Sequence, residues 1–200
     1  MGELRAPPGP AAVHLCLDMQ RLFGPEGPWP TPWMERVLPT VARIVERAPA
    51  RSVFTRFIPA ATPDDAHGMW RAYYHKWQDV TRRSLDLSLL DLMPALQRYV
   101  PPAKIFDKPV YSAFAGGTLH AELRRGRIDT LIITGAETDV CVLSTILSAV
   151  DLGYRIIVVR DGLCSSADES HDALLALYAR RFDLQVELTD AERLLEAWRG

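Results

Sequence analysis

Residues 130–159 read TLIITGAETDVCVLSTILSAVDLGYRIIVV, and this stretch decides the fold class. Its two ends, Thr130–Thr134 and Arg155–Val159, are near-continuous apolar runs of the kind found in strands buried on both faces. Between them, Asp139–Leu152 is expected to form a helix that ends at Gly153, because glycine favours the position just after a helix. A strand, a helix and a second strand in this order predict a right-handed βαβ unit within a parallel sheet.

The same alternation extends in both directions from this unit. Further strands are expected at Val13–Leu17, Ser52–Phe57, Lys104–Phe106 and Gln185–Glu187. Further helices are expected at Pro32–Arg47, with a break or kink at Pro39, and at Asp65–Gln78, Thr118–Arg125, Asp168–Arg181 and the C-terminal end. The pattern predicts an α/β protein: a three-layer α/β/α sandwich with a mostly parallel, doubly wound sheet of about six strands. Residues 11–200 are expected to form one domain, behind a flexible tail at residues 1–10.

Composition narrows the class of function. The chain has 200 residues, of which 48% are hydrophobic and 24% are charged, as in an average soluble globular protein. With a net charge of −2, the chain lacks the excess of basic residues that is typical of a nucleic-acid binder. No apolar run is long enough to span a membrane. Three cysteines and no signal-peptide pattern favour a reducing, cytoplasmic setting. We therefore expect neither nucleic acid nor a membrane as a partner.

Three reactive residue types follow three of the predicted strands. Asp18, Lys108 and Cys141 come at or just after strand ends, and in such sheets the site lies beyond the carboxyl ends of the strands. A thiol in the first turn of a helix meets free backbone N–H groups, which favour the thiolate, and an adjacent carboxylate can take its proton. Taken singly, each residue has an ordinary explanation as a turn residue, a surface charge or a buried small side chain. Together they predict a reactive site.

The motifs around these residues resemble those of the isochorismatase-like cysteine hydrolases, a family that includes nicotinamidases, N-carbamoylsarcosine amidases and ureidoacrylate amidohydrolases. The resemblance rests on Asp18-x-Gln20-x-x-Phe23, Lys108-x-x-Tyr111-Ser112-Ala113-Phe114 and Gly135-x-x-Thr138-Asp139-x-Cys141-Val142. It implies a catalytic triad of Asp18, Lys108 and Cys141.

The resemblance also implies how a substrate is held. The backbone N–H groups of Glu137 and Cys141 would form an oxyanion hole, with a non-proline cis peptide between Ala136 and Glu137. Substrate contacts are expected from Gln20, Phe23, Arg56, Tyr111 and Thr138. Members of the family usually form homodimers or homotetramers, so the same is expected here.

The chain departs from the metal-dependent nicotinamidases. Those enzymes resemble one another in an Asp-x-His segment after the second strand, where this chain has Thr55-Arg56-Phe57. His67 and His75 are eight residues apart, a poor spacing for two ligands on one helix face. We therefore expect no metal and no other cofactor. The implied function is metal-independent hydrolysis of a C–N bond in a small amide, ureido or carbamoyl compound, through a thioester.

Several positions keep more than one interpretation. Arg56 is either a surface arginine or a partner for a substrate carboxylate. The aromatic stripe Trp70, Tyr73, Tyr74 and Trp77 is better explained as core or subunit interface than as a pocket wall. The Glu137 side chain either narrows the pocket, contacts a substrate amine or points to solvent. Cys16 and Cys164 are expected to be packing residues.

Two other functions compete with amide hydrolysis. An isochorismatase-type enzyme would cleave a vinyl ether by acid catalysis without the Cys141 thiolate. A non-catalytic binding protein could keep the fold without the chemistry. Neither the substrate nor the oligomeric state follows from the sequence.

Overall fold

The computed structural model describes residues 4–199, and a single six-stranded sheet forms its centre. The strands are β1 (Ala12–Leu17), β2 (Ser52–Phe57), β3 (Lys104–Lys108), β4 (Thr130–Gly135), β5 (Arg155–Leu163) and β6 (Val186–Thr189). Their order is β3-β2-β1-β4-β5-β6, and every neighbouring pair is parallel. The order reverses between β1 and β4, so the doubly wound α/β prediction is confirmed.

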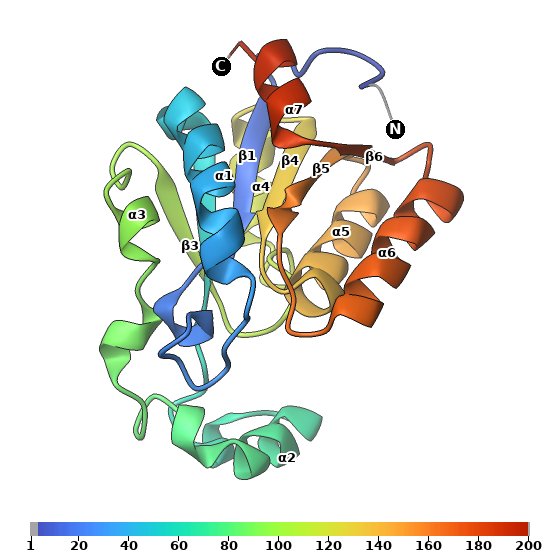
Figure 1. Ribbon diagram of the computed structural model, residues 1–200. Helices are drawn as coiled ribbons and strands as arrows, with labels where there is room; N and C mark the ends of the chain where they lie inside the picture. Colours follow the sequence, from blue (N-terminus) through green and yellow to red (C-terminus); the bar gives the residue numbers. More distant parts are fainter. Residues whose placement is uncertain (1–3, 200) are drawn as a thin grey trace.

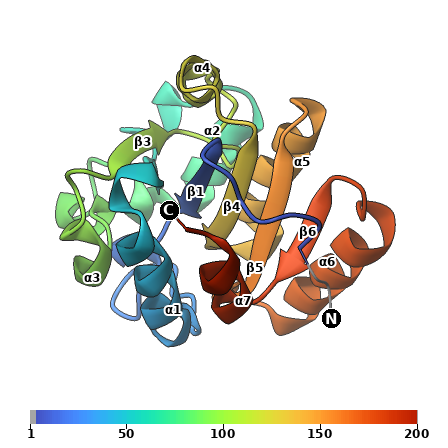
Figure 2. The same ribbon diagram turned by 90° about the horizontal axis from the view of Figure 1, so that it is seen from above.

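Helices cover both faces of this sheet (Figures 1 and 2). They are α1 (Met34–Arg47), α2 (Met69–Lys76), α3 (Pro94–Gln97), α4 (Thr118–Arg125), α5 (Leu143–Asp151), α6 (Asp168–Arg181) and α7 (Ala191–Ala197). One core cluster joins the sheet to α4, α5 and α6, and others join its opposite face to α1, α3 and α7. The three layers are therefore helix, sheet, helix.

Several element boundaries differ from the sequence-based expectation. Helix α1 does not break at Pro39, which lies inside it with an exposed ring. The helix predicted at Asp139–Leu152 begins with one π-helical turn, η6 (Thr138–Val142), before α5. The single helix predicted at Asp65–Gln78 is a 3₁₀ turn, η3 (Pro63–Asp65), followed by α2 after Gly68 (φ +55°). Further 3₁₀ turns are η1 (Arg21–Phe23), η2 (Pro49–Arg51), η4 (Gln78–Val80) and η5 (Leu87–Leu90).

The chain before β1 contacts the body of the domain. Residues 1–3 of the predicted tail lie outside the described residues. Beyond them, the Arg5 backbone N–H donates to Glu187 at 2.8 Å, and Arg155 donates to the Ala6 carbonyl oxygen at 2.7 Å. The domain boundary at residue 11 stays a prediction. In residues 4–199, no helix has the length and apolar content that a membrane crossing requires.

The strand register brings the three reactive residues to one edge of the sheet. Leu17 pairs with Gly135 across β1 and β4, so Asp18 and Ala136 leave the sheet side by side. Phe57 pairs with Lys108 across β2 and β3. The segment containing α2 lies beyond this carboxyl edge and away from the two helical layers (Figure 1).

Candidate active site

A buried ion pair forms the centre of the site. Lys108 Nζ lies 2.6 Å from Asp18 Oδ2, and the two side chains are 4% and 0% exposed. Thr55 on β2 donates its hydroxyl to the other carboxylate oxygen, Oδ1, at 2.6 Å. Asp18 has a positive φ of +50°, a conformation in which its own N–H bonds the Thr55 carbonyl oxygen at 3.2 Å. The carboxylate is therefore held from two sides before any substrate is present.

The Cys141 thiol interacts with both members of this pair. It lies in the π-helical turn η6, is 5% exposed, and is close enough to Asp18 and Lys108 for both to shift its pKa. Burial, then the Asp18 carboxylate, raises the pKa of Cys141 well above its ordinary value, and Lys108 opposes this rise. Burial therefore acts against the resting thiolate that the helix N-terminus was expected to favour. The thiol keeps its proton and has a carboxylate beside it to receive it.

Lys108 remains an ammonium in this buried position. Burial lowers the pKa of Lys108, but the charge of Asp18 and the neighbouring Cys141 more than compensate, and the net shift is upward. Its Nζ also donates to the Val110 carbonyl oxygen at 3.1 Å and lies 5.3 Å from the Phe57 ring centroid. The single positive charge of Lys108 thus interacts with both the Asp18 carboxylate and the Cys141 thiol.

The turn that carries Cys141 begins with an unusual backbone path. A cis peptide joins Ala136 to Glu137, directly after Gly135, whose φ is +114°. The Ala136 N–H donates to the Leu17 carbonyl oxygen at 2.8 Å. A Cβ on Gly135 would overlap the Leu17 backbone, so only glycine fits this close approach of β4 to β1.

Cys141 opens into a cavity of about 480 Å³. Most of its wall is aromatic or proline, and it is lined by Phe23, Pro28, Trp29, Pro30, Phe57, Tyr73, Trp77, Tyr111, Glu137, Val140, Cys141 and Ser166. Phe23, Tyr111 and Glu137 are residues that the sequence singled out. Trp29 and its flanking prolines were missed, because they lie in an irregular loop without periodicity.

The aromatic stripe divides between the cavity and the core. Tyr73 and Trp77 line the cavity, which corrects the preferred interpretation of the stripe as core or interface alone. Tyr74 is 2% exposed and belongs to the core, and Trp70 packs edge-on against Tyr111 at 4.8 Å between ring centroids. Helix α2 is short, so only some of its positions can face the cavity.

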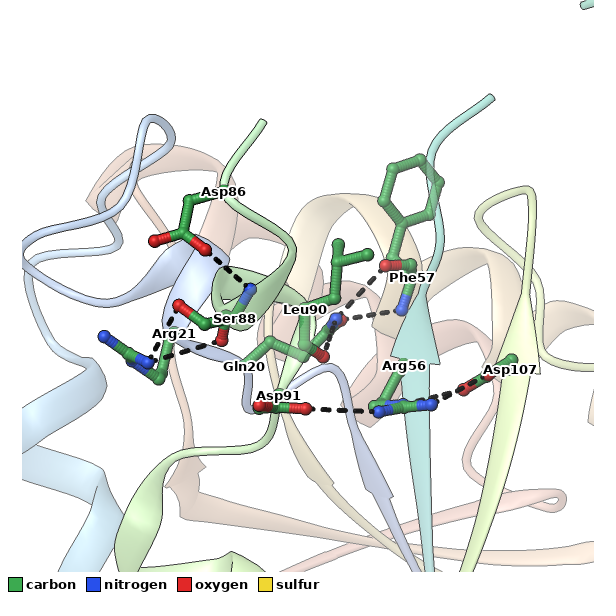
Figure 3. A network of polar contacts seen from close by, with 9 residues as sticks. All are labelled: Gln20, Arg21, Arg56, Phe57, Asp86, Ser88, Leu90, Asp91 and Asp107. Atoms are coloured by element: carbon green, nitrogen blue, oxygen red, sulfur yellow. Dashed lines mark hydrogen bonds and ion pairs between the residues drawn. The ribbon is translucent and has the colours of Figure 1, made fainter. Parts of the chain in front are cut away.

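Gln20 and Thr138 are among the expected substrate contacts, but they do not line the cavity. The buried Gln20 amide donates to the carbonyl oxygens of Phe57 (3.1 Å) and Leu90 (2.9 Å) and accepts from the Phe57 N–H at 2.7 Å (Figure 3). The Thr138 hydroxyl contacts His171 Nδ1 at 2.8 Å and the Cys164 carbonyl oxygen at 3.2 Å. Both residues hold neighbouring elements in place.

Arg56 does not line the cavity either. Its guanidinium makes a two-point contact with Asp107 at 2.8 and 2.9 Å, and lies 3.6 Å from Asp91 (Figure 3). Neighbouring residues of a strand point to opposite faces, so Phe57 faces the cavity and Arg56 faces away. The geometry gives no support to a substrate carboxylate at Arg56.

The residues after β2 do not fit a metal site. Neither Phe57, the last residue of β2, nor Ile58 and Pro59 after it supply a metal-ligating side chain. Across residues 4–199, no group of three or more His, Cys, Asp and Glu side chains is placed to hold a metal ion.

The isochorismatase domain model matches residues 12–193 of this chain. The chain belongs to the isochorismatase-like hydrolase family. It is 31% identical to an N-carbamoylsarcosine amidase from Arthrobacter sp., over 76% of this chain and 58% of that protein. It is 28% identical to nicotinamidase 3 of Arabidopsis thaliana, over 96% of this chain and 92% of that protein. The family resemblance of the motifs is confirmed.

Solved structures show the same fold. A cysteine hydrolase from Pseudomonas syringae pv. phaseolicola superposes with a TM-score of 0.84 at 22% identity, covering 97% of this chain and 95% of that one. The chain spans 53% and 58% of the lengths of the Bacillus subtilis isochorismatase family protein PncA and the Arthrobacter amidase that it matches.

Proposed function

We propose that this protein is a metal-independent cysteine hydrolase that cleaves a C–N bond of a small amide, ureido or carbamoyl compound through a thioester. The supporting observation is the Cys141 thiol, which lines an aromatic cavity and interacts electrostatically with the buried Asp18–Lys108 pair. Membership of a family with curated amidases supports the same reaction class.

In the first half-reaction, Asp18 takes the proton of Cys141 as the sulfur attacks the carbonyl carbon. The carbonyl oxygen becomes an oxyanion, which the backbone N–H groups of Glu137 and Cys141 stabilise. Asp18 then passes the proton to the leaving nitrogen, the C–N bond breaks, and the amine or ammonia departs. An acyl thioester remains on Cys141.

Water completes the reaction. Asp18 takes a proton from a water molecule that attacks the thioester, and the C–S bond breaks with return of the proton to sulfur. The products are a carboxylic or carbamic acid and the free thiol. Throughout, Lys108 orients the Asp18 carboxylate and balances the negative charge in a site that excludes bulk water.

The test is ammonia release from a panel of primary amides, ureido acids and carbamoyl compounds. Cys141→Ala should lose at least ~1000-fold in kcat/KM, because no other group can form the thioester. Cys164→Ala is the matched control, since Cys164 is also buried but does not line the cavity. Acid-quenched wild-type enzyme should also carry an acyl mass on the peptide containing Cys141.

Full activity in Cys141→Ala would refute covalent catalysis. Activity of that variant toward a vinyl ether would instead favour acid catalysis by Asp18 without the thiol.

A further inference from the structure

The formal charge of the cavity wall is negative. Among the lining residues in the described part of the chain, Glu137 alone carries a formal charge at neutral pH, and none is Lys, Arg or His. Lys108 is paired with Asp18, and Arg56 is paired with Asp107 on the other face of β2. A substrate carboxylate would therefore find no free cation in this wall, whereas a positive charge would find Glu137.

The Glu137 side chain is fixed by its neighbours. Its Oε2 accepts hydrogen bonds from the Ser166 backbone N–H at 2.9 Å and from the Ser166 hydroxyl. Both bonds fall on the same oxygen, so Oε1 keeps its capacity to accept from a ligand. Glu137 and Ser166 both line the cavity, as Cys141 does.

The remaining wall is suited to a cation. The Trp29 ring lies 6.1 Å from Tyr73 and 5.8 Å from Trp77, where it meets the second indole nearly at right angles. These three rings line the same cavity at different orientations. The faces of aromatic rings attract alkylammonium groups. Lys76 is exposed and does not line the cavity, but its ammonium lies 5.3 Å from the Trp77 ring centroid, so this ring already interacts with a cation from outside the cavity.

From this arrangement we propose that the cavity selects small amides that carry a positive charge, with the alkylammonium group among Trp29, Tyr73 and Trp77 and with Glu137 as its counter-ion. The amide carbonyl would then face Cys141. The turnover of such a compound rests on the proposed function, but its binding does not. The selectivity can therefore be measured without catalysis.

The binding test uses the Cys141→Ala protein and two ligands of the same shape. Betaine amide carries a trimethylammonium group, and 3,3-dimethylbutanamide carries a neutral tert-butyl group in its place. Calorimetric titration should show the cationic amide binding at least ~10-fold more tightly than its neutral isostere. Malonamate, an anionic amide, should bind more weakly than either.

A matched pair of further substitutions locates the selectivity. Glu137→Gln in the same background keeps the backbone and most of the side-chain volume, and should reduce the preference for the cation to under ~3-fold. Glu169→Gln makes the same charge change on the exposed start of α6 and should leave the preference unchanged. Retained binding of the neutral isostere shows that each variant is folded.

Three results would overturn the proposal: no detectable binding of betaine amide, equal or tighter binding of the neutral or anionic amide, or a cation preference that survives Glu137→Gln. Failure of the proposed function is recognised separately. It would appear as unchanged hydrolysis after Cys141→Ala, whatever the ligand preference.

Discussion

The Cys141 thiol and the Asp18 carboxylate share one buried ammonium, so the two acids compete for the same positive charge. Lys108 opposes the rise in the pKa of Cys141 that burial and Asp18 produce. Lys108 should therefore govern how readily the sulfur becomes reactive.

Lys108→Met is expected to slow alkylation of Cys141 by iodoacetamide at least ~10-fold at neutral pH, because removal of the ammonium raises the pKa of the thiol further. Mass spectrometry of the Cys141 peptide gives the rate. Lys104→Met, on the same strand but exposed, is the control and should react like wild type. Faster labelling in Lys108→Met would contradict the electrostatic role.

A second buried group makes stability depend on pH. His14 in β1 is fully buried between the hydroxyls of Thr134 (2.7 Å) and Ser52 (3.4 Å), and burial lowers its pKa to about 3. The unfolded chain takes up a proton at this residue below pH ~6.5, whereas the folded protein does not. His14 therefore does not reduce the free energy of unfolding above pH ~6.5. Below that pH the unfolded chain gains a proton that the folded protein does not, so the free energy of unfolding falls as the pH decreases toward 3.

The slope should be about 1.4 kcal/mol of unfolding free energy per pH unit within this window. Urea unfolding at pH ~6.5 and ~5 should show a loss in wild type about 2 kcal/mol larger than in His14→Gln. His67→Gln, at an exposed position, should behave as wild type. An NMR titration that finds His14 protonating above pH ~5 would contradict this account.

Among single residues, the sequence predicted best the site residues that lie at the ends of strands. Asp18, Lys108 and Cys141 could be placed together because the carboxyl ends of parallel strands meet at one edge. Trp29 could not, since a proline-flanked loop has no period that fixes where its side chains point. Gln20 and Thr138 stand at motif positions, but their hydrogen-bond partners come from segments distant in sequence, which no local pattern specifies.

Among the elements, the junction of β4 with η6 depends most on a single residue. Gly135→Ala should destabilise the protein by more than ~3 kcal/mol, because the new Cβ overlaps the Leu17 backbone and φ is +114°. Gly116→Ala is the matched control, since a Cβ there meets no atom within 4 Å and should change stability by less than ~0.5 kcal/mol. Chemical denaturation measures both, and a neutral Gly135→Ala would contradict the tight junction.

The elements that could be predicted are those with strong periodic or continuous apolar patterns. β4, β5 and α6 follow this rule. The segment between β2 and β3 does not, because it contains three short 3₁₀ turns and two short helices, whose shape is set by tertiary contacts such as those of Gln20. The π-helical turn η6 was likewise invisible, since its residues also suit an ordinary helix.

For the molecule as a whole, α2 is the part of the cavity wall that lies away from the two helical layers (Figure 1). Its aromatic side chains contact other segments at few points: Trp70 packs against Phe57 and Tyr111, and Tyr73 packs against Trp29. Trp77, directly after α2, also packs against Trp29. Segments with few buried contacts open at lower free energy than a sheet core.

Hydrogen exchange should therefore be faster in Met69–Lys76 than in β1 or β4. Saturation with a cavity ligand in the Cys141→Ala protein should slow exchange in this helix and leave the sheet unchanged. Mass spectrometry of peptic peptides measures both. Uniform protection in the free protein would show that α2 is as firmly held as the core.

The single charge in the cavity wall also bears on the end of the catalytic cycle. Hydrolysis of a carboxamide converts an uncharged group into a carboxylate within the space that Glu137 shares with Cys141. Because no lysine, arginine or histidine lines the cavity within residues 4–199, the new anion meets like charge there. The product of a cationic amide keeps the ammonium group that Glu137 attracts but gains a carboxylate that Glu137 repels, so under the proposed function it should bind more weakly than the amide and inhibit turnover only weakly.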